Sequence, residues 1–157
     1  MSTLELPSNL ERFFENCSGR IKRSFFLIFT GLLVVCALPP FYILPLGFVG
    51  FIFFFLFLMR CETWKKAFRT GWLFGIGFFG GGLFWLTNAF LVHSDQHAWL
   101  IPIAVPALAI SMGLFIALTA TLTFILWRRD ISKNSLLARI LLFAIAWCLM
   151  EWVRGVI

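Results

Sequence analysis

Charged residues are scarce in this chain. Asp, Glu, Lys and Arg make up 13% of its 157 residues, about half of their share in an ordinary soluble domain. Only two histidines and four cysteines are present, and the cysteines form neither a CxxC motif nor another metal-ligand spacing. No nucleophilic residue stands beside a base. The sequence therefore predicts no catalytic residue, no cofactor-binding residue and no metal site.

Apolar residues are correspondingly abundant, at 61% of the chain, and they include 21 Phe and 7 Trp. So many large apolar side chains do not fit inside the core of a small soluble domain, because such a domain leaves much of its surface exposed. A lipid bilayer is the solvent that accepts this surface. We therefore predict an all-α membrane protein, a polytopic helical bundle of about five transmembrane helices.

The apolar runs, and the prolines between them, divide the chain. Residues 1–23 are expected to form a polar cytoplasmic arm, and residues 24–157 a transmembrane domain. Pro39-Pro40 ends the first apolar run, since proline lacks an amide donor and clashes with the preceding helical turn. A helix needs about 20 residues to cross the hydrocarbon layer. The expected spans are 24–38, 41–59, 71–92, 101–127 and 136–157.

The basic residues give these spans a direction. Twelve of the 13 Lys and Arg lie before the first span, between the second and third, or around the junction of the fourth and fifth. By the positive-inside rule these segments are cytoplasmic, so the N-terminus lies inside and the fifth span ends outside. The net charge of +6 is thus a topology signal. We expect no nucleic-acid partner, because no recognition motif accompanies the charge.

The stretch Gly71–Leu86 is rich in glycine and aromatic residues, and it contains Gly75-x-Gly77-x-x-Gly80, the spelling of a dinucleotide-binding fingerprint. That fingerprint requires a strand before its first glycine and a helix that starts there. Here it falls in the middle of an expected membrane helix, where a phosphate loop would leave backbone donors unpaired. We interpret Gly71/Gly75 and Gly77/Gly81 instead as small-residue pairs that let helices approach closely.

Glu151 and Arg154 are the ionisable pair within an apolar span, and their spacing places them on one helix face. Intramembrane charges usually face a bundle interior or a polar cavity. The pair is therefore the candidate substrate-binding site, in contact with a lipid headgroup or substrate near the outer surface. A structural ion pair, or an Arg154 that reaches outer phosphates, is the competing interpretation. The other polar group, His93, Asp95 and His97, is interpreted as an exposed loop and not as a metal site.

Three blocks occur in an order and at a spacing that resemble one family: Ala37–Phe41 (ALPPF), Phe68–Trp85 (FRTGWLFGIGFFGGGLFW) and Glu151–Gly155 (EWVRG). Together they look like the N-terminal membrane half of bacterial apolipoprotein N-acyltransferase. The resemblance implies an inner-membrane fold of eight helices with a nitrilase-like domain on the outer side. It also implies that a Glu-Lys-Cys triad of that domain moves a fatty acyl chain from a phospholipid to the α-amino group of the diacylglyceryl-cysteine of an apolipoprotein, through a thioester.

These 157 residues contain no such domain, and Cys148 lies in a membrane span, where it does not match the family nucleophile. We therefore expect a fragment that corresponds to the first five helices, truncated before the catalytic domain and inactive alone. Its expected partners are the phospholipid acyl donor, the apolipoprotein substrate and membrane lipids. A split gene, with a separate chain that supplies the catalytic domain, stays open. The alternative is a non-enzymatic membrane scaffold or a small transporter subunit, although no internal repeat indicates a transporter.

Overall fold

Five α-helices and no strands make up the part of the chain that the computed structural model describes, residues 12, 19–83, 101–128 and 135–156. In chain order they are α2 (Arg20–Val35), α3 (Leu44–Met59), α4 (Trp64–Gly82), α7 (Ile101–Arg128) and α8 (Leu136–Val156). The all-α class that the composition predicts is therefore confirmed.

Two of these helices are long and apolar enough to cross a membrane, namely α7 from Pro102 onwards and α8. Helix α3 is apolar but has 16 residues, which corresponds to a length of about 24 Å against a hydrocarbon layer of about 30 Å. Residues 84–92 of the expected third span, and the group His93, Asp95 and His97, lie outside the described residues. Five membrane crossings thus stay a prediction.

Local signals explain where the helices begin. Thr63 caps α4, because its hydroxyl accepts a hydrogen bond from the backbone N–H of Lys66 at 3.3 Å. Helix α4 therefore starts before Gly71, the first residue of the expected span. Pro45 lies in the first turn of α3, where a backbone N–H has no partner within the helix in any case. Helix α3 accordingly begins at Leu44 rather than at the expected residue 41.

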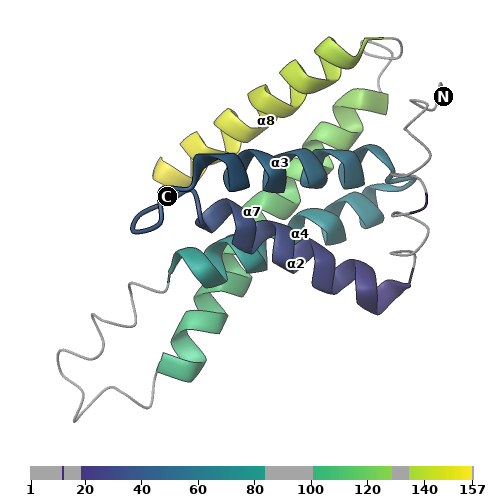
Figure 1. The fold of residues 1–157 in the computed structure, drawn as a ribbon. Coiled ribbons are helices and arrows are strands. Elements are labelled where there is room, and N and C mark those ends of the chain that lie inside the picture. Colours follow the sequence, from purple (N-terminus) through teal and green to yellow (C-terminus); the bar gives the residue numbers. More distant parts are fainter. Residues whose placement is uncertain (1–11, 13–18, 84–100, 129–134, 157) are drawn as a thin grey trace.

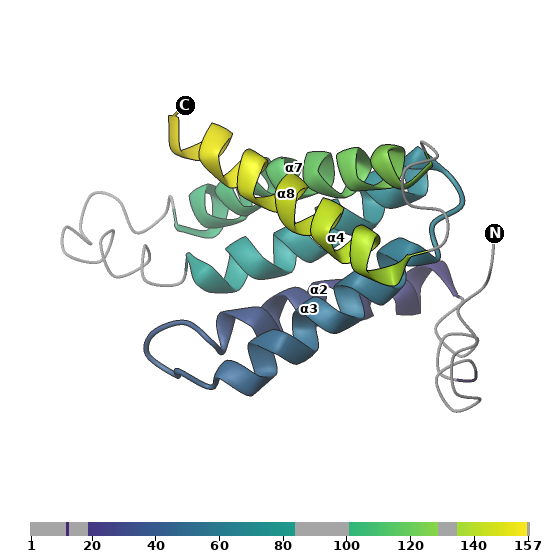
Figure 2. The ribbon, with the colours of Figure 1, turned by 90° about the horizontal axis from the view of Figure 1, so that it is seen from above.

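Helix α4 is the centre of the bundle. Figures 1 and 2 show α2 on one side of it and α7 on the other, with α3 beside α2 and α8 packed on α7. The two views also place the first turns of α2, α4 and α8 and the last turns of α3 and α7 at one end of the bundle. We call this the basic end, because it carries Lys22, Arg23, Arg60, Lys65, Lys66, Arg69, Arg128 and Arg139. The loop 36–43 and the last turn of α8 lie at the opposite end.

The glycines of α4 form two packing faces, one for each neighbouring helix. A Cβ added at Gly75 would lie 2.7 Å from the Cα of Gly113 on α7, and one added at Gly71 would lie 2.6 Å from the carbonyl oxygen of Ile116. On the other face, a Cβ at Gly77 would overlap the backbone of Ile28 on α2. The interpretation of the glycines as packing residues is confirmed, since α4 approaches both helices at backbone distance.

Aromatic rings fill the space between α4 and the outer helices. Phe54 of α3 stacks on Phe74 of α4 with ring centroids 4.1 Å apart, and both side chains are fully buried. Helix α8 joins this cluster through Trp147, whose ring lies edge-on to Phe51 at 5.1 Å. Offset and edge-to-face arrangements of this kind are the favourable ones for aromatic pairs. The cluster therefore ties α3, α4 and α8 together.

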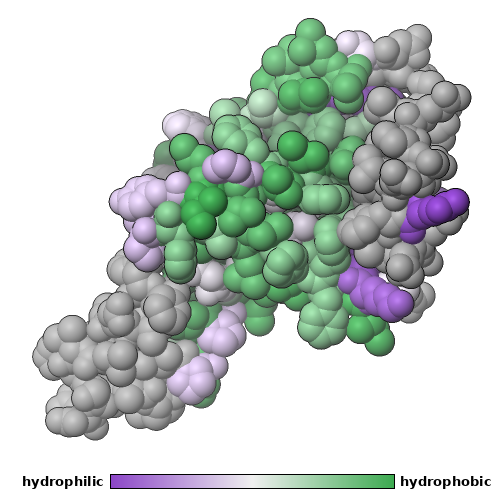
Figure 3. All heavy atoms as spheres, in the orientation of Figure 1, coloured by the Kyte–Doolittle hydropathy of each residue, from purple (hydrophilic) through white to green (hydrophobic). Residues whose placement is uncertain are grey.

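The outside of the bundle is apolar as well. Figure 3 shows hydrophobic residues over most of the described surface, while the most strongly hydrophilic ones lie towards the basic end. Helix α8 exposes Leu137, Leu141 and Trp152, the last two with 53% and 68% of their surface accessible. Contiguous exposed apolar surface of this extent marks a membrane or protein contact.

Candidate functional site

The predicted pair Glu151 and Arg154 lies on the last turns of α8, at the opposite end of the bundle from the basic end. The Nε of Arg154 donates to Oε2 of Glu151 at 3.2 Å, and its Nη2 donates to the same oxygen. The guanidinium also lies 5.4 Å from the ring centroid of Phe79 on α4. The two residues thus form the ion pair that their spacing predicts, and the cation–π contact fixes the end of α8 to α4.

This pair is only partly withdrawn from the surface. The side chain of Arg154 is 36% exposed and that of Glu151 38%. A guanidinium carries five N–H donors, and one carboxylate oxygen receives only part of them. Arg154 can therefore hold its place against α4 and still offer donors to a phosphate or carbonyl group at the surface. A role of the pair in substrate binding stays a prediction.

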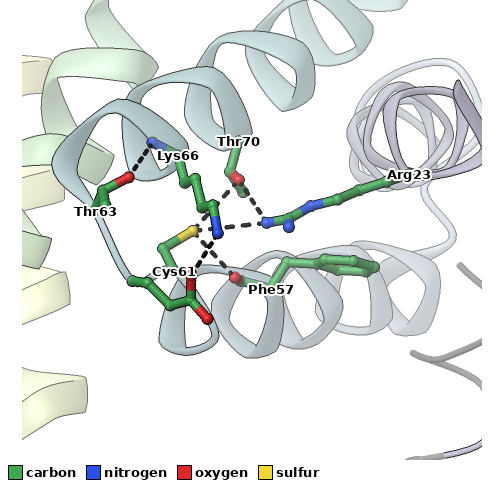
Figure 4. A network of polar contacts seen from close by, with 7 residues as sticks. Arg23, Phe57, Cys61, Thr63, Lys66 and Thr70 are labelled. Atoms are coloured by element: carbon green, nitrogen blue, oxygen red, sulfur yellow. Dashed lines mark hydrogen bonds and ion pairs between the residues drawn. The ribbon is translucent and has the colours of Figure 1, made fainter. Parts of the chain in front are cut away.

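A second polar cluster, which the sequence did not reveal, lies at the basic end where α2 meets the start of α4 (Figure 4). Arg23 of α2 donates from Nη2 to Thr70 Oγ1 at 3.1 Å and to Cys61 Sγ at 3.7 Å. Its guanidinium lies 5.5 Å from the ring centroid of Phe57. The Sγ of Cys61 in turn donates to the carbonyl oxygen of Phe57 at 3.4 Å. This network joins α2, α3 and α4.

Cys61 is the buried cysteine of this cluster, with 1% of its surface accessible. Burial raises the pKa of its thiol, and the hydrogen bond with Thr70 and the charge of Arg23 offset part of that increase. The thiol is therefore protonated at neutral pH, whereas the thiolate is the nucleophilic form. Cys61 is a packing and hydrogen-bonding residue, and its environment is not that of a thiol that carries an acyl group.

Two further basic residues complete the cluster on α4. Lys66 forms an ion pair with Glu62, and the hydrogen bond from Lys66 and then its charge lower the pKa of that carboxyl group, with a smaller effect of Arg23. Arg69 donates from Nη2 to Ser24 Oγ at 3.2 Å. Between these side chains lies a cavity of about 240 Å³, which is lined by Arg23, Ser24, Leu27, Lys66, Arg69, Thr70 and Leu73.

From the sequence, these basic residues were interpreted as topology signals. Their clustering around one cavity was not predicted. Arg23 and Thr70 are 47 positions apart, and no motif links them. Only the pairing of α2 with α4 brings them together. The capping residue Thr63 was the available signal, because it indicates a helix that begins before Lys66 and Arg69 and so places both on the helix that faces α2. Among the described residues, no three His, Cys, Asp or Glu side chains gather as metal ligands.

Comparison with known proteins places the chain next to a bacterial family. Residues 30–157 match the family model described as apolipoprotein N-acyltransferase N-terminal domain. Proteins called apolipoprotein N-acyltransferase are similar to it in Sinorhizobium medicae (38% identical over 156 residues, 90% of this chain) and in Rhizobium rhizogenes (34% over 157 residues, 90% of this chain). One from Rhodopseudomonas palustris is 37% identical over 139 residues, or 85% of this chain.

The match covers only part of these relatives. The chain spans 28% of the length of the first two proteins and 25% of the third. No solved structure matches the chain.

Proposed function

The chain belongs to the apolipoprotein N-acyltransferase family, and we propose that its helices form the membrane platform on which such an enzyme transfers its acyl group. The observation that carries this proposal is the family match over residues 30–157, which includes all of α3, α4, α7 and α8. In the reaction that the family resemblance implies, a phospholipid gives a fatty acyl chain to the α-amino group of an apolipoprotein. The platform offers both lipid-borne substrates a lateral entrance from the bilayer.

The acyl transfer itself belongs to a nitrilase-like domain with a Glu-Lys-Cys triad. Cys61 fits this division of labour, because it is buried and its thiol has a raised pKa. We expect these 157 residues to be inactive alone. They act together with the catalytic domain, whether it is joined to them in one chain or supplied by a separate chain.

The basic end of the bundle faces the cytoplasm in this proposal. Lys and Arg side chains gather there, among them Lys22, Arg23, Arg60, Lys65, Lys66, Arg69, Arg128 and Arg139. The opposite end, with the loop 36–43 and the last turn of α8, contains Arg154 alone among described basic residues. This asymmetry supports a multi-pass inner-membrane protein with a cytoplasmic N-terminus. The pair Glu151 and Arg154 then lies at the outer leaflet, on the side of the catalytic domain.

A chimera tests the proposed function. The chain is joined in frame to the part of the Sinorhizobium medicae relative that follows its matched region, and it is expressed in cells depleted of their own enzyme. We expect a lipoprotein with an N-acylated cysteine, which mass spectrometry of its N-terminal peptide detects. The 157 residues alone should give none. A chimera that accumulates in the membrane but leaves the amino group unmodified would contradict the proposal.

Arg154 is proposed to shape the lateral entrance and to contact the phosphate of the incoming phospholipid. In the chimera, Arg154→Ala should lower the rate of N-acylation at least about tenfold, because a hydrogen bond to a charged group contributes about 1.5–3 kcal/mol. The amount of chimera in the membrane should not change.

The matched control is Arg128→Ala. Arg128 also lies over a phenylalanine ring, that of Phe124 at 5.5 Å, but it is at the basic end. Its replacement should leave N-acylation unchanged. Equal rates of N-acylation in the Arg154 and Arg128 variants would show that Arg154 has no role at the entrance. Its ion pair with Glu151 would then be structural only.

A further inference from the structure

The cavity at the basic end is positively charged and lies at the opposite end of the bundle from Glu151 and Arg154. Three of its seven lining residues are cations, namely Arg23, Lys66 and Arg69, and none is a carboxylate. Ser24 and Thr70 add hydroxyl groups, while Leu27 and Leu73 supply an apolar wall. Its volume of about 240 Å³ is several times the roughly 30 Å³ that one water molecule occupies in the liquid.

Its positive charge is only partly compensated within the described residues. Arg23 and Arg69 donate to neutral acceptors, the Oγ1 of Thr70 and the Oγ of Ser24. Neither guanidinium has a carboxylate of the described residues within ion-pair distance, whereas Lys66 pairs with Glu62. An anion in the cavity would meet two guanidinium groups that are already oriented by hydrogen bonds.

We propose that this cavity binds a phosphate group, and in the membrane that of an anionic phospholipid from the cytoplasmic leaflet. Guanidinium groups match phosphate oxygens in a bidentate geometry. Basic pockets between membrane helices on the cytoplasmic side bind anionic headgroups for the same reason. The apolar wall of Leu27 and Leu73 suits the glycerol and first methylene groups that follow the phosphate. The bound lipid would hold α2 against α4.

This site differs from the acyl-donor site in position and in purpose. The proposal of this site rests on the proposed cytoplasmic placement of the basic end, and it does not rest on acyl transfer. The binding experiment is therefore done on the purified chain in neutral detergent, without a catalytic domain, so that a failed chimera and a failed binding site are distinguishable.

The probes are phosphatidylglycerol, zwitterionic phosphatidylcholine and inorganic phosphate, and the readout is bound lipid by native mass spectrometry together with the thermal unfolding midpoint. We expect phosphatidylglycerol to bind and to raise the midpoint, and phosphatidylcholine to do neither. An effect of phosphatidylglycerol without one of inorganic phosphate identifies a headgroup site. An equal effect of inorganic phosphate identifies a site for the free ion, with the same phosphate chemistry.

A double variant, Lys66→Gln with Arg69→Gln, should weaken phosphatidylglycerol binding at least about tenfold, since it removes two charged donors. The control, Lys65→Gln with Arg128→Gln, removes the same charge from the same end, but neither residue lines the cavity. It should bind as the natural chain does. Equal binding by the two double variants, or equal binding of the two lipids by the natural chain, would overturn the proposal.

A measurement on the natural chain makes the test independent of any effect of the variants on folding. Phosphatidylglycerol should slow the acetylation of Lys66 more than that of its neighbour Lys65, whose Nζ lies 5.6 Å from the ring centroid of Trp64. Equal protection of the two lysines would show that the lipid acts on the charged surface as a whole, and it would overturn the cavity site.

Discussion

Gly75→Ala and Gly77→Ala should each destabilise the folded chain by about 1–3 kcal/mol, the usual cost of overpacking, although alanine is the better helix former by about 1 kcal/mol. The added methyl group at residue 75 would lie 2.7 Å from the Cα of Gly113, and the one at residue 77 would overlap the backbone of Ile28. Backbone atoms cannot turn aside as a side chain does. The neighbouring helix must therefore move away, and the aromatic contacts around it loosen.

The control for both variants is Gly82→Ala, because nothing lies within 4 Å of a Cβ added at Gly82. The same chemical change should leave the stability unchanged or raise it slightly there. The measurement is the thermal unfolding midpoint in detergent, together with the amount of protein that accumulates in the membrane. If all three variants behaved alike, the glycines would act through helix propensity and not through close packing.

The two interfaces should respond separately. Gly75 faces α7, whereas Gly77 faces α2, and α2 carries Arg23 of the basic cavity. We expect Gly77→Ala to disturb the Arg23–Thr70 contact more than Gly75→Ala does. A loss of packing between α4 and α2 would thus disturb the contacts at the basic end. The contacts of Arg154 at the end of α8 would be less affected.

Short-range patterns in the sequence predicted the features that depend on neighbouring residues. The pairs Gly71/Gly75 and Gly77/Gly81 follow from helical periodicity alone, and so does the ion pair of Glu151 with Arg154. The all-α class was predicted from the long apolar runs and the apolar share of 61%, and the described residues form helices and no strands. The three family blocks predicted the family, which the match over residues 30–157 confirms.

Features that depend on helix pairing could not be predicted in this way. The contact of Arg23 with Thr70 requires that α2 lie beside α4 in one register. The spacing of the glycines predicts that another helix packs closely against α4, but it does not identify that helix. The apolar pattern that predicts the third span begins near Gly71, whereas the helix itself begins at Trp64, after the capping residue Thr63.

We propose that the bundle spans the membrane with its basic end in the cytoplasm and its opposite end at the outer leaflet. Two exposed positions test it: Phe41, which is 62% exposed in the loop 36–43, and Glu62, which lies between α3 and α4 with its side chain 75% exposed. Each is replaced by cysteine in turn, in a chain that carries Cys17→Ala, Cys36→Ala and Cys148→Ala. Cys61 stays, because burial and a raised pKa keep its thiol unreactive.

A membrane-impermeant maleimide is then added to intact cells and to cells with a permeabilised inner membrane. The parent chain, which carries no introduced cysteine, gives the background from Cys61. We expect Phe41→Cys to be labelled in intact cells and Glu62→Cys to be labelled only after permeabilisation. Labelling of Glu62→Cys in intact cells, or protection of Phe41→Cys there, would contradict it.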